Sequence, residues 1–204
     1  AAQRIDTAIQ EYWHALTMPL AIDNNQQLYI RLQDDRVTIS LDSSGANLYR
    51  RGLKSHGANA PLRESTAAFI LARAGYHADR PLIDPMCGSG TFSLEAALVA
   101  KGIPPGFYRS FAFEQWPAFR QKHWIYLKKK ATETIRSLPA PLIQASDRHR
   151  GACRKLTDCV EANALGDTIH VRCDDFFSIT PISTDGPPGL IVLRDKQANT
   201  TRVY

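Results

Sequence analysis

The feature that most constrains this chain is a turn with two glycines between a short apolar stretch and an amphipathic segment. Pro81-Leu-Ile-Asp84 is apolar and ends in an acid, and Pro85-Met-Cys-Gly-Ser-Gly90 separates it from the segment Thr91–Ala100. Two closely spaced glycines let the backbone turn tightly and approach a ligand closely. The pattern predicts a strand, a ligand-binding turn and a helix in an open α/β sheet, where ligands bind beyond the carboxyl ends of the strands.

The rest of this region repeats the alternation of strand and helix. Further strands are expected at 141–147, 168–173 and 189–193, and further helices at 61–76 and 150–164. Strands that alternate with helices imply a parallel, doubly wound, Rossmann-like sheet.

The first 50 residues follow a different pattern. Apolar residues at helical spacing predict a helix over 4–16, and the alternating stretches 28–32 and 36–41 predict a hairpin that turns at Asp34-Asp35. A helix and a hairpin are only part of a small α+β module. Residues 51–60 are expected to form a linker to the α/β domain.

The turn after Asp84 does not have the sequence of a phosphate-binding loop, because no Gly-Lys-Ser/Thr follows it, and it lacks the third glycine of the dinucleotide pattern. An acid before the turn suits a cationic ligand, and S-adenosylmethionine (SAM) carries an ammonium and a sulfonium group. The residues expected to bind this cofactor are Asp84, Pro85, Met86, Cys87, Gly88, Ser89, Gly90 and Thr91.

Two further acids follow the next strands. Asp147 ends the second strand, where a carboxylate can accept both ribose hydroxyls of a nucleoside. Asp175 follows the third strand, where it can accept a hydrogen bond from an adenine amino group while Phe176 covers the ring. Helix or turn capping is the alternative role for both acids, a core position is the alternative for Phe176, and Asp174 is a close rival of Asp175.

Positive charge is concentrated in the middle of the chain. The whole chain has a net charge of +5, yet residues 101–160 hold 12 Lys and Arg against 4 Asp and Glu, a net of +8. Such clustering favours a polyanion such as nucleic acid, and a solvated helix face is the alternative. The candidate RNA contacts are Arg120, Lys122, Lys128, Lys129 and Lys130.

The remaining composition argues against metals and membranes. No pair of the four cysteines has Cys-x-x-Cys spacing, so reduced thiols in a cytoplasmic protein are expected and a zinc site is not. No apolar run reaches the length of about 18 residues that spans a bilayer. The oligomeric state is left open.

Together these motifs resemble the bacterial large-subunit rRNA guanine-N2 methyltransferases that carry a THUMP RNA-binding domain. The matching stretches are Ser40-Leu-Asp-Ser-Ser-Gly45, Leu48-Tyr-Arg-Arg-Gly52, Ala60-Pro-Leu-Arg-Glu64, Asp84 to Ala97 and Phe111-Ala-Phe-Glu-Gln-Trp-Pro-Ala-Phe119. The resemblance implies a class I SAM-dependent methyltransferase fold over 61–204, preceded at 1–50 by the C-terminal part of a THUMP domain. It also implies methyl transfer to the exocyclic N2 of a guanine in 23S rRNA.

One departure from the family concerns catalysis. The family places Asn-Pro-Pro-Tyr after the fourth strand, whereas Arg194-Asp195 follows Leu193 here and the tetrapeptide occurs nowhere in the chain. We therefore assign no catalytic residue, and expect an incomplete catalytic domain from a longer protein, with an exposed sheet edge. A catalytically inactive RNA-binding or assembly module and an adenine-N6 methyltransferase are the alternatives.

Overall fold

The computed structural model describes residues 2–15, 26–54, 62–179, 188–195 and 200–204. These residues form two compact units, Ala1–Gly45 and Ala46–Tyr204, and each unit is described by itself. The division falls at Gly45, earlier than the expected boundary at residue 50. Most of the expected linker, the first residue of the expected helix 61–76 and Leu16 lie outside the described residues.

The first unit contains the predicted helix and hairpin. Its elements are α1 (Ala2–Ala15), β1 (Leu28–Gln33) and β2 (Arg36–Leu41), and the two strands pair antiparallel. Asp34 and Asp35 adopt left-handed conformations with φ of 48° and 59°. Two consecutive left-handed residues make the two-residue turn whose twist matches that of paired strands.

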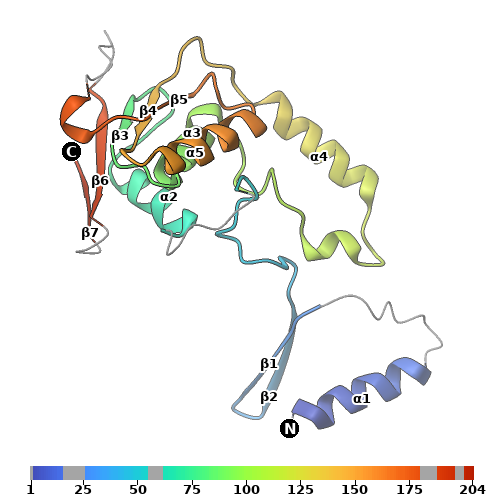
Figure 1. The fold of residues 1–204 in the computed structure, drawn as a ribbon. Coiled ribbons are helices and arrows are strands. Elements are labelled where there is room, and N and C mark those ends of the chain that lie inside the picture. Colours follow the sequence, from blue (N-terminus) through green and yellow to red (C-terminus); the bar gives the residue numbers. More distant parts are fainter. Residues whose placement is uncertain (1, 16–25, 55–61, 180–187, 196–199) are drawn as a thin grey trace. The chain divides into compact units, whose positions relative to one another are not determined.

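The second unit is built on a five-stranded sheet in the order β5-β4-β3-β6-β7 (Figure 1). The strands are β3 (Leu82–Asp84), β4 (Ile143–Ser146), β5 (Ile169–Arg172), β6 (Leu190–Asp195) and β7 (Thr200–Val203). The first four are parallel, as the alternation of strands and helices predicted. Because β3 has a neighbouring strand on each side, the turn that follows it lies between the carboxyl ends of β4 and β6.

The strand β7 was not predicted. It pairs antiparallel with β6, from Val192 opposite Val203 to Asp195 opposite Thr200, and Tyr204 exchanges two further backbone hydrogen bonds with Ile191. β7 therefore satisfies the backbone groups on that side of β6, and β7 is the last strand on this side of the sheet among the described residues.

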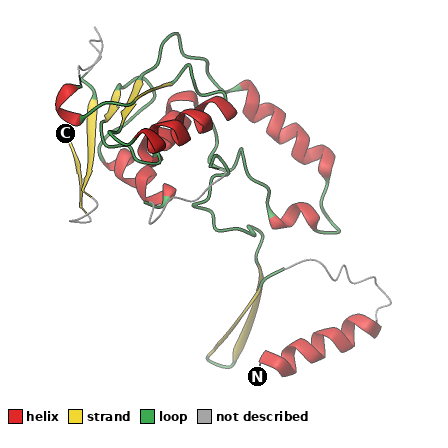
Figure 2. Ribbon diagram, in the orientation of Figure 1, coloured by secondary structure: helices red, strands yellow, loops and turns green. Residues whose placement is uncertain are grey.

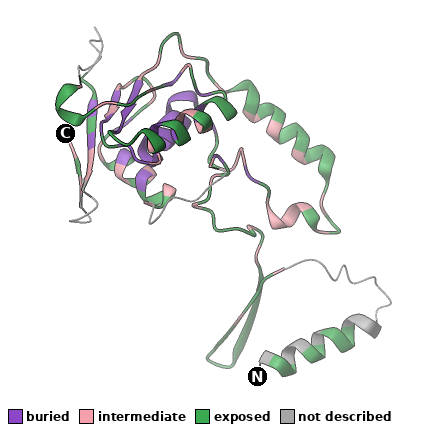
Figure 3. Cartoon of the chain, viewed as in Figure 1, coloured by how far each residue is buried: buried purple, intermediate pink, exposed green. Residues whose placement is uncertain are grey.

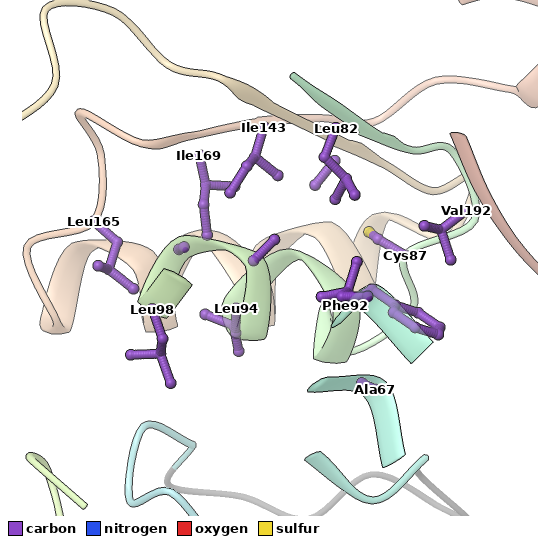
Figure 4. Close-up of a cluster of buried hydrophobic side chains, with 14 of the residues drawn as sticks. Ala67, Leu82, Cys87, Phe92, Leu94, Leu98, Ile143, Leu165, Ile169 and Val192 are labelled. Carbon is purple, nitrogen blue, oxygen red and sulfur yellow. The ribbon is translucent and has the colours of Figure 1, made fainter. Parts of the chain in front are cut away.

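Three helices pack with the sheet to form the core (Figure 2). They are α2 (Glu64–Arg73), α3 (Thr91–Lys101) and α5 (Arg150–Ala162). Every residue of α3 except Val99 is buried, which makes it the central helix (Figure 3). Leu82, Ile143 and Ile169 project from three strands toward the helices (Figure 4), and Leu94 of α3 belongs to the same buried cluster.

Residues 46–54 belong to the second unit and pack against its core, although part of this segment was expected to be linker. Arg51 forms a two-pronged ion pair with the buried Glu95 of α3, with Nε–Oε1 and Nη2–Oε2 distances of 3.0 and 3.2 Å. The buried guanidinium of Arg109 donates to the backbone carbonyls of Asn47 and Arg50. The segment is therefore tied to the core by charge-assisted hydrogen bonds, which are stronger than neutral ones.

The insertion at 101–139 contains η1 (Ala112–Gln115), a short 3-10 helix, and α4 (Gln121–Glu133). Phe111 and Phe113 stack on each other, and both meet Trp124 of α4 edge-on at centroid distances of 5.9 and 5.2 Å. Arg109 lies 4.8 Å from the centroid of Phe111. The aromatic residues of the insertion thus form a small cluster that packs against the start of α4.

Gly52 provides a test of how closely residues 46–54 pack. It has a φ of +87°, and a Cβ at this position would lie 2.3 Å from the carbonyl oxygen of Tyr108. We predict that Gly52→Ala lowers the free energy of unfolding by more than about 1 kcal/mol in urea denaturation. Gly151→Ala is the matched control, because Gly151 lies in α5 with nothing within 4 Å of the added Cβ, and it should raise stability by up to about 1 kcal/mol. Equal effects of the two substitutions would contradict this packing.

Candidate functional site

A cavity of about 570 Å³ lies at the carboxyl ends of the parallel strands. Each strand region contributes part of the wall: Pro85 and Met86 after β3, Asp147 to His149 after β4, Asp175 to Phe177 after β5, and Leu193 and Arg194 within β6. Ligands bind at this edge of open α/β sheets, and the volume falls within the usual range for ligand sites, about 300–1,000 Å³.

The turn after β3 depends on close backbone packing. Gly90, the residue before α3, has a φ of +71°, and a Cβ there would lie 2.3 Å from Cδ1 of Leu156 on α5. Only glycine satisfies both the left-handed backbone and this approach of two elements. The second glycine of the motif thus lets the turn and α5 come together beside the cavity.

Asp147 joins the turn to the end of β4. Its Oδ2 accepts a hydrogen bond from the backbone N–H of Gly88 at 2.9 Å, and its Oδ1 accepts one from the N–H of His149 at 2.9 Å. The N-cap residue of α5 is His149, so the carboxylate caps the preceding loop and not the helix. Each carboxylate oxygen has a further lone pair that can accept a ligand hydroxyl.

Asp84 occupies a different environment from the one expected. It is 3% exposed, its Oδ2 accepts a hydrogen bond from Ser93 Oγ at 2.7 Å, and it is not part of the cavity wall. Burial raises the pKa of Asp84 to about 6, against the opposing effect of the Ser93 hydrogen bond. In this structure Asp84 connects the end of β3 to the first turn of α3.

The remaining predicted cofactor residues divide into two groups. Pro85, Met86, Asp147, Asp175 and Phe176 line the cavity. Cys87, Gly88, Ser89, Gly90 and Thr91 are not among the residues that line it. Their direct contact with a cofactor stays a prediction.

The structure separates Asp175 from its rival Asp174. Asp174 pairs with Arg172 at 2.8 Å and is not in the cavity wall, whereas Asp175 is. Asp175 also accepts a hydrogen bond from the N–H of Phe177 at 3.0 Å, so the capping role is present as well. That cap uses Oδ1 alone. Phe176 and Phe177 meet edge-to-face at 5.1 Å and expose 39% and 92% of their surface.

Sequence reasoning missed Lys54. Its Nζ donates to Thr91 Oγ1 at 2.8 Å and to Ser89 Oγ at 3.3 Å, and lies 3.9 Å from Glu64. Burial lowers the pKa of Lys54, against the effect of the nearby carboxylates. No local pattern links Lys54 to a turn 35 residues away, and Lys54 lies outside the stretches that carry the family resemblance. Arg148, His149, Phe177, Leu193 and Arg194 were also missed as wall residues.

The predicted RNA contacts lie on or beside α4, outside the cavity wall. Arg120 precedes the helix, and Lys122, Lys129 and Lys130 are exposed, while Lys128 is half-buried with its Nζ 5.2 Å from the centroid of Trp124. In the part of the chain that the structure describes, no group of three potential metal ligands occurs and no helix is long and apolar enough to cross a bilayer.

The fold and the cavity define a Rossmann-like domain of the class I methyltransferase type. Residues 51–193 match the family described as "RMKL-like, methyltransferase domain". The chain belongs to this family. The match ends at Leu193, the last residue before the sequence departs from Asn-Pro-Pro-Tyr.

Known proteins agree with this assignment. The chain is 40% identical over 157 residues to "Putative RNA methyltransferase slr0064" of Synechocystis, covering 76% of this chain and 41% of that protein. It is 34% identical over 206 residues to "Ribosomal RNA large subunit methyltransferase K/L" of Marinomonas, covering 94% of this chain and 28% of that protein. The chain therefore spans less than half the length of these relatives.

A solved structure confirms the fold. "SMU.472, a putative methyltransferase complexed with SAH" matches with a TM-score of 0.73 and 27% identity, covering 93% of this chain and 52% of that chain. The expected class I methyltransferase-like α/β fold is confirmed.

The buried Asp84 predicts a pH dependence of stability. Because its pKa is about 6 in the folded chain and ordinarily 3.8, the folded state retains the proton between these values after the unfolded state has lost it. Stability should therefore fall as pH rises from about 4 to 6 and level off above that. Asp84→Asn keeps an acceptor for Ser93 and should remove this pH dependence of stability. The dependence amounts to up to about 3 kcal/mol, at about 1.4 kcal/mol per pKa unit. Urea unfolding of both chains at pH 4 and pH 7 measures this dependence. A difference in stability between the two chains that is the same at both pH values would contradict the raised pKa.

Proposed function

We propose that this chain contains the SAM-binding part of an RNA methyltransferase that modifies the exocyclic N2 of a guanine in large-subunit (23S) rRNA. One observation carries the proposal. The glycine turn, Asp147 and Asp175 follow three successive strands of the parallel sheet, and residues from all three places line one cavity.

The residues around the cavity suit a nucleoside with a cationic methionine side chain. A carboxylate that already accepts two backbone N–H groups, as Asp147 does, is held rigidly for hydrogen bonds from ribose hydroxyls. Asp175 can accept from the adenine amino group with the oxygen that its cap leaves unused, and Phe176 offers an apolar ring beside it.

SAM supplies a methyl group that its sulfonium has already activated, so the protein mainly orients donor and acceptor. The wall residues after β4 and β5 would fix the nucleoside end of the donor. Lys54 acts as a positioning residue, since its hydrogen bonds to Ser89 and Thr91 restrain the turn.

Several observations support RNA as the acceptor. Both curated relatives are named as RNA methyltransferases, and residues 101–160 carry a net charge of +8. A guanine must leave its stack to reach such a cavity, at a cost of a few kcal/mol. Phosphate contacts from the basic region would offset that cost. An rRNA substrate implies a cytoplasmic location, and residues 1–50 would then contribute to RNA binding as part of a THUMP domain.

The acceptor side of the cavity differs from what the family resemblance implies. Arg194 lies in the wall directly after Leu193, where the family resemblance calls for the Asn of Asn-Pro-Pro-Tyr. A cationic guanidinium has no acceptor for the amino group of a base. This observation favours a second candidate function for the chain as it stands, an RNA-binding module that binds SAM without transferring its methyl group.

The first test is cofactor affinity, measured by calorimetry with the demethylated product of SAM. We expect Asp175→Ala to weaken binding roughly 10-fold to 100-fold, because a hydrogen bond to a charged acceptor is lost. Asp175→Asn keeps the cap and should weaken binding less. Asp174→Ala is the matched control, because Asp174 lies outside the cavity wall, and it should leave affinity within about twofold. Undetectable binding by the unchanged chain, or equal effects at 174 and 175, would overturn the assignment.

The second test separates transfer from binding. Unmodified 23S rRNA is incubated with radiolabelled SAM and either this chain or a chimera that continues from Leu193 with the sequence of the Marinomonas relative. We expect at least about 100-fold less methyl incorporation by this chain, because acceptor alignment is absent. Nucleoside digestion should identify N2-methylguanosine in the chimera's product. Equal incorporation by both proteins would show that the departure after Leu193 is unimportant. N6-methyladenosine in the digest would show that the acceptor is an adenine N6 and not a guanine N2.

A further inference from the structure

The exposed side of α4 carries a stripe of basic residues with a tyrosine at its centre. Lys122, Tyr126 and Lys129 are spaced four and three residues apart, so they share one face of the helix, and Lys130 lies beside them. All four are exposed, and Tyr126 exposes 55% of its surface. Figure 3 shows α4 as largely exposed along its length.

The opposite face of α4 is the packed one. Trp124, Lys128 and Ala131 follow one another at the same helical spacing and are all half-buried. Trp124 packs against Phe111 and Phe113, and Lys128 lies over the Trp124 ring. Of the three consecutive lysines, Lys128 is therefore engaged with the aromatic cluster, while Lys129 and Lys130 lie toward solvent.

The stripe has the charge and the apolar surface of a nucleic-acid contact. Between Gln115 and Thr132 the sequence has five basic residues and no acidic one. Within the described residues, none of Lys122, Lys129 and Lys130 forms an ion pair with a carboxylate. Lys130 Nζ lies 5.1 Å from the centroid of the Tyr126 ring. The ammonium group covers one face of the ring, so that a base could stack on the other face.

We propose that Lys122, Tyr126, Lys129 and Lys130 form a stacking platform for single-stranded RNA, separate from the SAM cavity. The proposal rests on the proposed function only in taking RNA as the substrate. A base would stack on the Tyr126 ring while the flanking lysines contact phosphates, the combination typical of proteins that bind single strands. Positive charge without paired carboxylates favours this occupant over an apolar protein partner.

The test measures RNA binding without SAM, by fluorescence anisotropy of a labelled single-stranded RNA of mixed sequence. Tyr126→Ala should weaken binding at least about fivefold, and Tyr126→Phe, which keeps the ring, less than twofold. Lys129→Ala should lower the salt slope by about 0.7. Lys155→Ala, an exposed lysine on α5, is the charge-matched control and should leave the slope unchanged. Binding of duplex RNA should be insensitive to Tyr126→Ala.

Three outcomes would overturn the platform. Equal affinities of the Tyr126→Ala and unchanged chains for single strands would remove the stacking role. Equal salt slopes for Lys129→Ala and Lys155→Ala would show that the lysines of the stripe form a solvated face that does not contact phosphates. A change of oligomeric state in Tyr126→Ala by sedimentation, without a change in RNA affinity, would identify the stripe as a contact between copies of the chain. Because none of these measurements uses SAM, failure here is distinguishable from failure of cofactor binding.

Discussion

The hydrogen bond from the backbone of Gly88 to Asp147 is the interaction on which the candidate site depends. It joins the turn after β3 to the end of the neighbouring strand β4. A second backbone bond, from Cys87 N–H to the carbonyl of Ser146, connects the same two places. The turn can be positioned this way only because β3 and β4 are adjacent and parallel, so that their carboxyl ends meet. The cavity lies at this junction, and its remaining wall comes from the loops and strands on either side.

A second series of contacts connects the core to the basic insertion. Arg51 bonds to Glu95 of the central helix, Arg109 bonds to the carbonyls of the same segment, and Arg109 then packs on Phe111. Phe111 in turn contacts Trp124 of α4. The helix that carries the proposed RNA platform is therefore attached through packed side chains to the helix that follows the cofactor turn.

For some residues of the site, the local sequence did not predict the surroundings that the structure shows. Asp84 was expected to face a cation; the structure shows it buried, with a hydrogen bond from Ser93, and its contact with a cofactor stays a prediction. Lys54 was not considered, because its partners Ser89 and Thr91 are distant in sequence. For Asp147 and Asp175, the end of a predicted strand was sufficient to place each acid at the cavity, because parallel strands bring their carboxyl ends to one edge.

The sequence by itself determined the parallel strands β3 to β6, the helices α3 and α5 between them and the glycine turn. Periodicity and turn residues act over a few positions and are visible without a fold. Only the tertiary structure decided which face of α4 packs, that β7 covers β6, and that Lys54 bonds to the glycine turn. Those features depend on contacts between distant residues, such as Gly90 with Leu156 or Val192 with Val203. Neither partner of such a pair carries a local signal of the other, so the pairing is set only when the whole core packs.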